Sequence, residues 1–149
     1  MFSIKPCTCL LYTSLDMDAN KRYLGFQDAC RRLSVDKPSA VDAAERQFVR
    51  MDYQETVAAI FRNHPDVDGI LCSNDVIAAE IIQYCRRHEI DIPGRLKLIG
   101  YDDTRFASLC SPQLTTIHQP VEDICRYAVE NIIHASSGRV VPTLSLIHI

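Results

Sequence analysis

Two short apolar runs decide the fold of this chain: residues 69–75 read GILCSND, and residues 96–103 read LKLIGYDD. Each run stops abruptly in acidic and amide side chains. Strands that are buried on both faces of a parallel sheet read as continuous Ile, Leu and Val, and ligands bind just beyond the carboxyl ends of such strands. Asn74 and Asp102 are therefore the first candidates for a polar small-molecule site.

Helical and strand-like segments alternate around these two runs. Apolar residues recur at spacings of three and four, as in amphipathic helices, and shorter apolar runs separate them. We expect helices at residues 18–33, 53–63, 76–88 and 121–133, and strands at residues 47–51, 69–73, 96–101 and 114–117. In the third helix, Val76, Ala79, Ile82 and either Tyr84 or Cys85 are expected to face inward. This alternation favours an α/β fold in which helices flank a parallel sheet through right-handed crossovers.

The composition is that of a globular domain with one hydrophobic core. The 149 residues are 47% hydrophobic and 23% charged, and the formal net charge is -3. A chain that binds nucleic acid by itself needs clustered Lys and Arg, which are scattered here. No apolar stretch approaches the roughly 18 residues of a membrane span, and the amino-terminal apolar patch is too short for a secretory leader. We expect no membrane association.

The cysteines point to a reducing compartment. Their number, seven, is odd, and most lie inside apolar periodic segments, as buried free thiols do. Cys7 and Cys9 form a CxC pair without a second Cys or His pair at metal-ligand spacing, so we expect no metal site there. We therefore expect a cytoplasmic protein.

Patterns typical of enzymes are absent from the sequence. The five histidines are dispersed, and none pairs with a Ser or Cys in a nucleophile-elbow pattern. No glycine-rich phosphate loop occurs either. We therefore expect neither catalysis nor a cofactor.

The polar strand ends allow more than one role. Asp102 and Asp103 could bind a divalent metal, accept hydrogen bonds from a sugar or base, or form a solvated turn. Successive strand residues point to opposite faces, which argues against a shared metal ion. Asn74 and Asp75 could cap the following helix, form an Asx-turn or contact a ligand, and these roles can be split between the two neighbours.

The stretch from residue 70 to residue 120 resembles the effector-binding domain of the LacI/GalR (lactose-repressor) family. It contains the SND turn, the turn and strand DIPGRLKLIGYDD, and the crossover LTTIHQP in the family's order and spacing. With RYLGFQDAC upstream and the helix after Pro120, the resemblance covers residues 19–143. It implies a periplasmic-binding-protein-like fold of type I, with two α/β lobes and a ligand between them, of which this chain is mainly the C-terminal lobe.

The resemblance also implies a function. The family consists of bacterial transcription repressors that act as homodimers, sense a small effector such as a sugar, and bind operator DNA through a helix-turn-helix head that is not in this chain. The effector acts by binding one lobe arrangement better than another. The family's dimer contacts would fall on residues 76–88 and 106–112, where Leu109 and Cys110 fit a partner surface.

Site residues follow from the resemblance one at a time. Arg22 stands where the family has an effector-contacting arginine, whose guanidinium can bind two hydroxyls or a carboxylate. Tyr53 stands where an aromatic ring stacks on the ligand. Asn74 and Asp102 match polar ligand contacts, and Gln119 matches a residue at the crossover between the lobes.

The domain organisation follows from the same resemblance. We expect residues 15–143 to be a partial sensor domain, with the C-terminal lobe at residues 15–117 and the crossover and a helix of the other lobe at residues 118–138. Residues 1–14 and 144–149 depart from the family and contain CLLYTS and LSLIHI, which resemble translated sequencing adapters. We expect these two segments to be non-native or disordered tails.

A sugar-binding protein of a transport system is the alternative with the same fold. Such a protein would need a secretory leader and would rarely carry so many free cysteines. Residues 101–119 follow the repressor pattern, where solute-binding proteins more often have a glycine-bearing loop. We therefore favour the repressor sensor.

Overall fold

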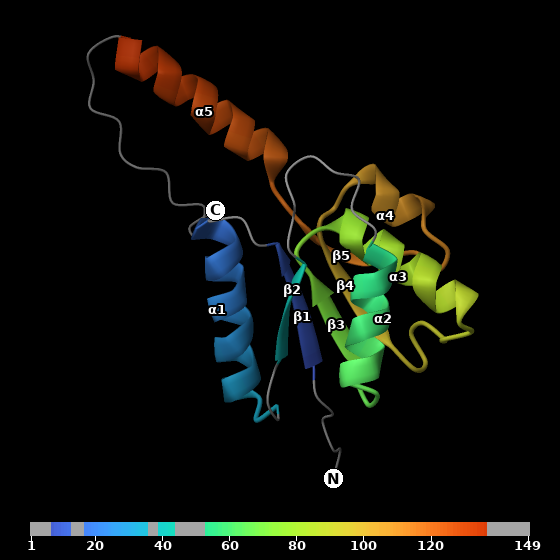
Figure 1. Ribbon diagram of the computed structural model, residues 1–149. Helices are drawn as coiled ribbons and strands as arrows, with labels where there is room; N and C mark the ends of the chain where they lie inside the picture. The colour runs from blue at the N-terminus through green and yellow to red at the C-terminus, as the bar shows by residue number, and fades with distance from the viewer. Residues whose placement is uncertain (1–6, 13–16, 36–38, 44–52, 137–149) are drawn as a thin grey trace. The chain divides into compact units, whose positions relative to one another are not determined.

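Strands and helices alternate along the chain in the computed structural model (Figure 1). The structure describes residues 7–12, 17–35, 39–43 and 53–136. The elements in chain order are β1 (Cys7–Tyr12), α1 (Met17–Arg32), β2 (Ser39–Ala43), α2 (Tyr53–Asn63), β3 (Gly69–Cys72), α3 (Asp75–Arg87), β4 (Lys97–Asp102), α4 (Arg105–Leu109), β5 (Thr115–His118) and α5 (Val121–Ser136).

The first of two units, Met1–His118, is built on one parallel sheet. Its five strands follow the order β2-β1-β3-β4-β5, and every paired neighbour runs parallel. Leu71 of β3 lies opposite Ile99 of β4, which lies opposite Thr115 of β5. The predicted α/β fold with a parallel sheet flanked by helices is confirmed. The strands predicted at residues 69–73, 96–101 and 114–117 are β3, β4 and β5.

The first two strands differ from the sequence-based prediction. β1 lies in the segment that the sequence predicts to be a tail, yet it pairs with β2 on one side and β3 on the other. Its sequence CTCLLY has residues that pleated strands favour, and both neighbouring strands need partners for their backbone groups. The non-native origin of residues 1–14 stays a prediction.

β2 is a strand that the sequence does not signal. Its sequence, SAVDA, has Val41 as the single β-branched residue among small and acidic ones, so it lacks the usual strand composition. The strand predicted at residues 47–51 lies outside the described residues. Pairing with β1 therefore decides the position of β2, and composition does not.

Helices cover both faces of the sheet, with α1 on one face and α2 and α3 on the other (Figure 1). Right-handed crossovers require this, because the connection from β1 to β2 runs across the sheet in the opposite direction from the later ones. The core packs between the sheet and the α2 and α3 pair. Its fully buried side chains include Val57 and Ile60 of α2, and Ile77 and Ile81 of α3.

The buried face of α3 is rotated from the predicted one. Val76 is 46% exposed and Ala79 is only partly buried, whereas Ile82 and Cys85 are buried as predicted. The buried stripe consists of Asp75, Ile77, Ala78, Ile81, Ile82 and Cys85. The physical reason is that Asp75 is hydrogen-bonded inside the protein, so the first turn of α3 faces inward at residue 75. Apolar periodicity cannot reveal a rotation that a polar residue decides.

The second unit, Gln119–Ile149, holds α5, which is the helix predicted after Pro120. Its first turn is formed by the Ile124 N–H, which donates to the backbone oxygen of Pro120 at 3.0 Å. Val129 and Ile132 are each more than half exposed on this helix. None of the described helices is long and apolar enough to cross a lipid bilayer.

Candidate functional site

The candidate site lies at the carboxyl edge of the sheet, where β3 and β4 end as paired neighbours. Residues 73–75, the SND turn, follow β3, and residues 102–104 end and follow β4. Because the two strands are parallel, their polar ends come to the same edge. The structure thus brings two predicted site residues, Asn74 and Asp102, to neighbouring strand ends.

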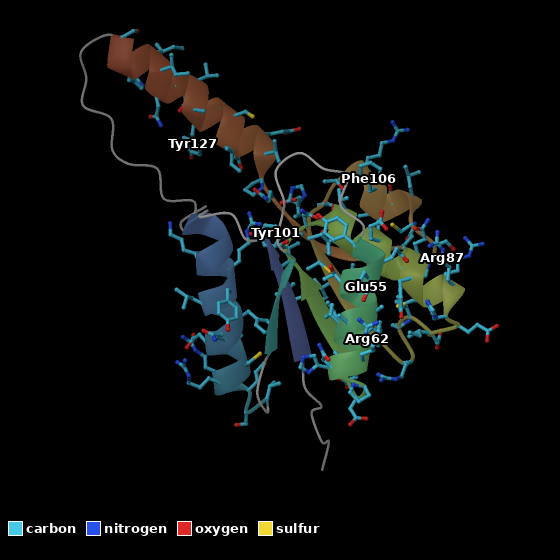
Figure 2. All side chains as sticks on the ribbon, viewed as in Figure 1. Glu55, Arg62, Arg87, Tyr101, Phe106 and Tyr127 are labelled. Atoms are coloured by element: carbon cyan, nitrogen blue, oxygen red, sulfur yellow. The ribbon has the colours of Figure 1, made fainter. Side chains whose placement is uncertain are left out.

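Arg22 reaches this edge from α1. Its Nη1 donates a hydrogen bond to the backbone oxygen of Ser73 at 3.0 Å. Its guanidinium carbon lies 4.2 Å from the centroid of the Tyr101 ring, in cation–π contact. Figure 2 labels Tyr101 at this edge of the sheet. One side chain therefore joins α1 to the ends of β3 and β4, next to Asn74.

Asn74 caps α3. Its backbone is extended, with φ of -157° and ψ of 171°, and its Oδ1 accepts a hydrogen bond from the Ile77 N–H at 2.9 Å. Capping is one of the three roles that the sequence leaves open for the residue. Another of these roles, contact with a ligand through the amide nitrogen, stays a prediction.

Asp75, the last residue of the SND turn, is fully buried. Its Oδ2 accepts hydrogen bonds from the backbone N–H and the hydroxyl of Thr104, at 2.6 and 2.9 Å. Its Oδ1 accepts from the hydroxyl of Thr116 at 2.5 Å. Burial raises the pKa of the Cys110 thiol, and the negative charge of Asp75 raises it further. Asn74 thus caps the helix, whereas Asp75 accepts hydrogen bonds from inside the protein, which is a role that the sequence does not indicate.

The turn at the end of β4 has an unusual backbone. Asp102 and Asp103 have φ angles of 101° and 52°, both in the left-handed region that residues other than glycine seldom adopt. The alternation of strand side chains, on which the sequence analysis relied, therefore does not apply to this pair. Oδ2 of Asp103 lies 2.7 Å from Nδ1 of His118. In the part of the chain that the structure describes, no three His, Cys, Asp or Glu side chains gather as a metal site.

Tyr53 is placed differently from the other predicted ligand contacts. It begins α2, is 7% exposed and belongs to the hydrophobic core cluster. Tyr53 therefore packs with the apolar side chains of the core. Stacking of Tyr53 on a ligand stays a prediction.

Gln119 lies between β5 and α5, at the start of the second unit. Its backbone oxygen accepts a hydrogen bond from the Val121 N–H at 2.8 Å. Its role at a crossover between two lobes stays a prediction.

Ser73 is a further polar residue at the candidate site, which the sequence does not single out. It is buried, and its Oγ has no hydrogen-bond partner among the described residues. Buried polar atoms are nearly always paired, so such a hydroxyl calls for an explanation. In the sequence it reads as one more capping residue before α3, and no signal separates it from Asn74.

The family of this chain follows from its similarity to known proteins. Residues 8–146 match the family described as periplasmic binding protein-like domain. This chain belongs to that family. The predicted fold of a periplasmic-binding-protein-like domain is therefore confirmed by the sheet order and by the family match alike.

Relatives of this periplasmic binding protein-like domain include sugar operon repressors. The chain is 30% identical over 112 residues to the ribose operon repressor of Bacillus subtilis, covering 75% of this chain and 33% of that protein. It is 33% identical over 109 residues to the sucrose operon repressor of Streptococcus mutans, covering 73% of this chain and 32% of that protein. The domain thus spans about a third of the length of these relatives.

Solved structures place the same fold in LacI-family proteins. A LacI family transcriptional regulator from an Arthrobacter species, solved in complex with lactose, is 26% identical, with a TM-score of 0.75. The match covers 95% of this chain and 52% of that chain. The resemblance to the LacI/GalR family is thereby confirmed. These relatives are named as a repressor and a transcriptional regulator.

Proposed function

We propose that this chain is part of the sugar-sensing domain of a LacI/GalR-type transcriptional repressor. The observation that carries the proposal is the contact of Arg22 with both strand ends, through the backbone of Ser73 and the ring of Tyr101. This contact brings the Arg22 guanidinium to the strand ends that are followed by Asn74 and closed by Asp102. Ligands of parallel α/β proteins bind at such strand ends. Relatives named as ribose and sucrose operon repressors favour a sensor over a transport protein.

The gathered groups suit a ligand with several hydroxyls. Arg22 presents a fork of N–H donors, of which one binds Ser73. The Asn74 amide uses its oxygen for the helix cap, and its nitrogen carries two donors outside that bond. Asp102 supplies carboxylate oxygens as acceptors. The buried Ser73 hydroxyl is a further polar group that a ligand could satisfy.

The complete pocket needs a second lobe. The chain spans about half of the lactose-bound regulator, so we expect the other half of the enclosing surface to come from the rest of the full-length protein. A ligand held by one lobe alone loses much of its buried surface. We therefore expect the isolated chain to bind its effector weakly.

The full-length protein would be a cytoplasmic regulator without catalytic activity or a cofactor. Effector binding would shift the population of lobe arrangements by differential affinity, and with it the spacing of two DNA-reading heads. The names of the repressor relatives support this, as do five free cysteines among the described residues. Operator DNA would be bound by a helix-turn-helix head.

A homodimer is part of the proposal, through residues 76–88 and 106–112. Val76 of α3 and Phe106 and Leu109 of α4 are large exposed apolar residues on these segments, and Figure 2 labels Phe106 on α4. The same two segments, with the loop that follows α3, line a cavity of about 450 Å³. Exposed apolar side chains that gather on one surface are typical of a protein–protein contact.

An NMR titration of the isotope-labelled chain tests the sugar-sensing proposal. The panel consists of D-ribose, sucrose and lactose, with hypoxanthine as a purine control. We expect one sugar to shift the amide signals of residues 73–75 and 102–104 with a millimolar dissociation constant. A response to hypoxanthine and to no sugar would contradict sugar sensing. A low-micromolar sugar affinity would contradict the need for a second lobe.

A further inference from the structure

The Asp75 carboxylate connects three neighbouring strands of the sheet, although it is not among the ligand contacts that the family resemblance implies. Its Oδ2 binds Thr104, which follows β4, and its Oδ1 binds Thr116 in β5, while Asp75 itself follows β3. These partners are 29 and 41 residues away along the chain. A buried carboxylate is tolerated when hydrogen bonds of this kind satisfy it.

The same network reaches the turn at the end of β4. The Asp103 N–H donates to the hydroxyl oxygen of Thr116 at 3.2 Å, and that hydroxyl donates to Asp75 at 2.5 Å. The next backbone N–H, that of Thr104, donates to Asp75 directly. Two successive backbone amides of the turn therefore depend on one carboxylate, one of them through a single hydroxyl.

The turn needs such support. Two consecutive residues with positive φ, Asp102 and Asp103, are held there only when the surroundings oppose relaxation to extended or helical backbone. The hydrogen bonds that end on Asp75 act on Asp103 and on the residue that follows it. Relaxation of the turn would move the Asp102 carboxylate away from the strand-end site.

We propose that Asp75 is a positioning residue of the ligand site. It holds Asp102 and Asp103 in their left-handed turn. It also fixes the position of that turn relative to Asn74, which precedes Asp75 in the chain. Asp75 acts through these residues and not by touching the ligand. This inference rests on the proposed function, because the turn matters to a ligand only if the strand ends bind one.

A purely local role of Asp75 predicts a different result. A carboxylate in the first turn of a helix interacts favourably with the helix dipole, so Asp75 could serve only to stabilise the start of α3. Its loss would then loosen the first turn of α3, including the Ile77 N–H that binds Asn74. Positioning predicts loosening at the Asp103 and Thr104 amides instead.

Amide hydrogen exchange on the whole chain separates the two roles. In Asp75→Asn, we expect exchange at Asp103 and Thr104 to accelerate by about tenfold relative to the amides of α2, because a charge-assisted hydrogen bond is replaced by a weaker one. The exchange rate of the Ile77 amide relative to the amides of α2 should not change. Asp66→Asn removes the same charge at an exposed site and should change neither ratio. Equal acceleration of exchange at all amides, or acceleration at the Ile77 amide alone, would overturn the proposal.

Thr116 offers a milder pair of variants, which decides the matter if Asp75→Asn does not fold. Thr116→Val keeps the shape of the side chain and removes the hydroxyl between the Asp103 N–H and Asp75. Thr116→Ser keeps the hydroxyl. We expect faster exchange at Asp103 in Thr116→Val and the wild-type rate in Thr116→Ser. Equal rates in the two variants would overturn the proposal.

Sugar binding then distinguishes a failure of this inference from a failure of the proposed function. With whichever of D-ribose, sucrose or lactose shifts the wild-type amides, Asp75→Asn should weaken binding by about tenfold, because the turn that carries Asp102 would occupy its binding arrangement less often. Asp66→Asn should leave the dissociation constant unchanged. An unchanged constant in Asp75→Asn would overturn positioning. If no sugar shifts the wild-type signals, sugar sensing fails, and the exchange ratios still decide the role of Asp75.

Discussion

Gly100 leaves the space that the Asp75 carboxylate occupies: a Cβ atom at residue 100 would lie 2.3 Å from Oδ1 of Asp75. The same atom would lie 2.8 Å from Cδ2 of Leu114. Both distances are far below van der Waals contact, and neither neighbour has room to move, since the carboxylate and Leu114 are buried. β4 therefore carries glycine here for close packing of the carboxylate.

Gly100→Ala should lower the free energy of unfolding by about 1–3 kcal/mol, because the added methyl group overpacks a buried site. Urea unfolding followed by circular dichroism measures the change. Gly25→Ala is the matched control: Gly25 lies within α1, and an added Cβ there has nothing within 4 Å. It should raise the free energy of unfolding by about 0.5–1 kcal/mol through helix propensity. A neutral Gly100→Ala would show that the carboxylate is not tightly packed.

The Arg22–Tyr101 contact should be measurable as a coupling energy. A double-mutant cycle of Arg22→Ala and Tyr101→Ala should give about 0.5–2 kcal/mol in the free energy of unfolding, since the guanidinium lies 4.2 Å from the ring centroid and the pair is partly buried. Arg126 and Tyr127 form the control pair. They are adjacent on α5, at 5.5 Å, and should show almost no coupling. Equal coupling energies in the two cycles would contradict a structural role for Arg22 at the strand ends.

Thiol reactivity should separate Cys85 from Cys125. Burial raises the pKa of the Cys85 thiol from 9.0 to about 11. The thiolate is the reactive form, so at pH 8 only about 0.1% of Cys85 would be ionised, against about a tenth of an ordinary thiol. Iodoacetamide at pH 8 should therefore modify the exposed Cys125 long before the buried Cys85, as peptide mass spectrometry can show.

The pH dependence of Cys85 has a definite sign. Its pKa is higher in the folded chain than in the unfolded chain, so its contribution to stability is complete below pH 9 and is lost as the pH rises toward 11. Alkylation of Cys85 should accelerate over the same range. Modification of Cys85 at the rate of Cys125 at pH 8 would show that α3 opens readily.

The sequence predicts those parts of the fold that depend on local pattern. Apolar runs ending in SND and YDD predict β3 and β4, because buried parallel strands need no polar alternation. β2 escapes prediction because SAVDA forms a strand through pairing with β1, which no window of sequence contains. The rotation of α3 escapes for a similar reason: Asp75 faces inward because of Thr104 and Thr116, far away along the chain.

The site shows the same division. The polar strand ends predict Asn74 and Asp102, and the family resemblance adds Arg22. In the structure the two strands are paired neighbours, and Arg22 contacts the ends of both. Neither the buried hydroxyl of Ser73 nor the carboxylate of Asp75 has a signal in the sequence, because each is defined by burial and partners. For Tyr53 the resemblance implies a ring that stacks on a ligand, whereas the structure buries the residue in the core cluster. A resemblance in sequence does not show how deeply a side chain is buried.

The proposed dimer surface can be tested with two leucines of equal exposure. Leu109, on α4, is 68% exposed, and Leu33, after α1, is 67% exposed. Leu109→Glu places a charge on the proposed surface and should shift the chain from dimer toward monomer in sedimentation velocity runs, because a carboxylate buried in an apolar contact lacks a partner. Leu33→Glu lies outside the proposed surface and should leave the equilibrium unchanged. If both variants dissociate the dimer equally, or if the wild-type chain is monomeric at all concentrations, residues 106–112 are not the contact in this chain.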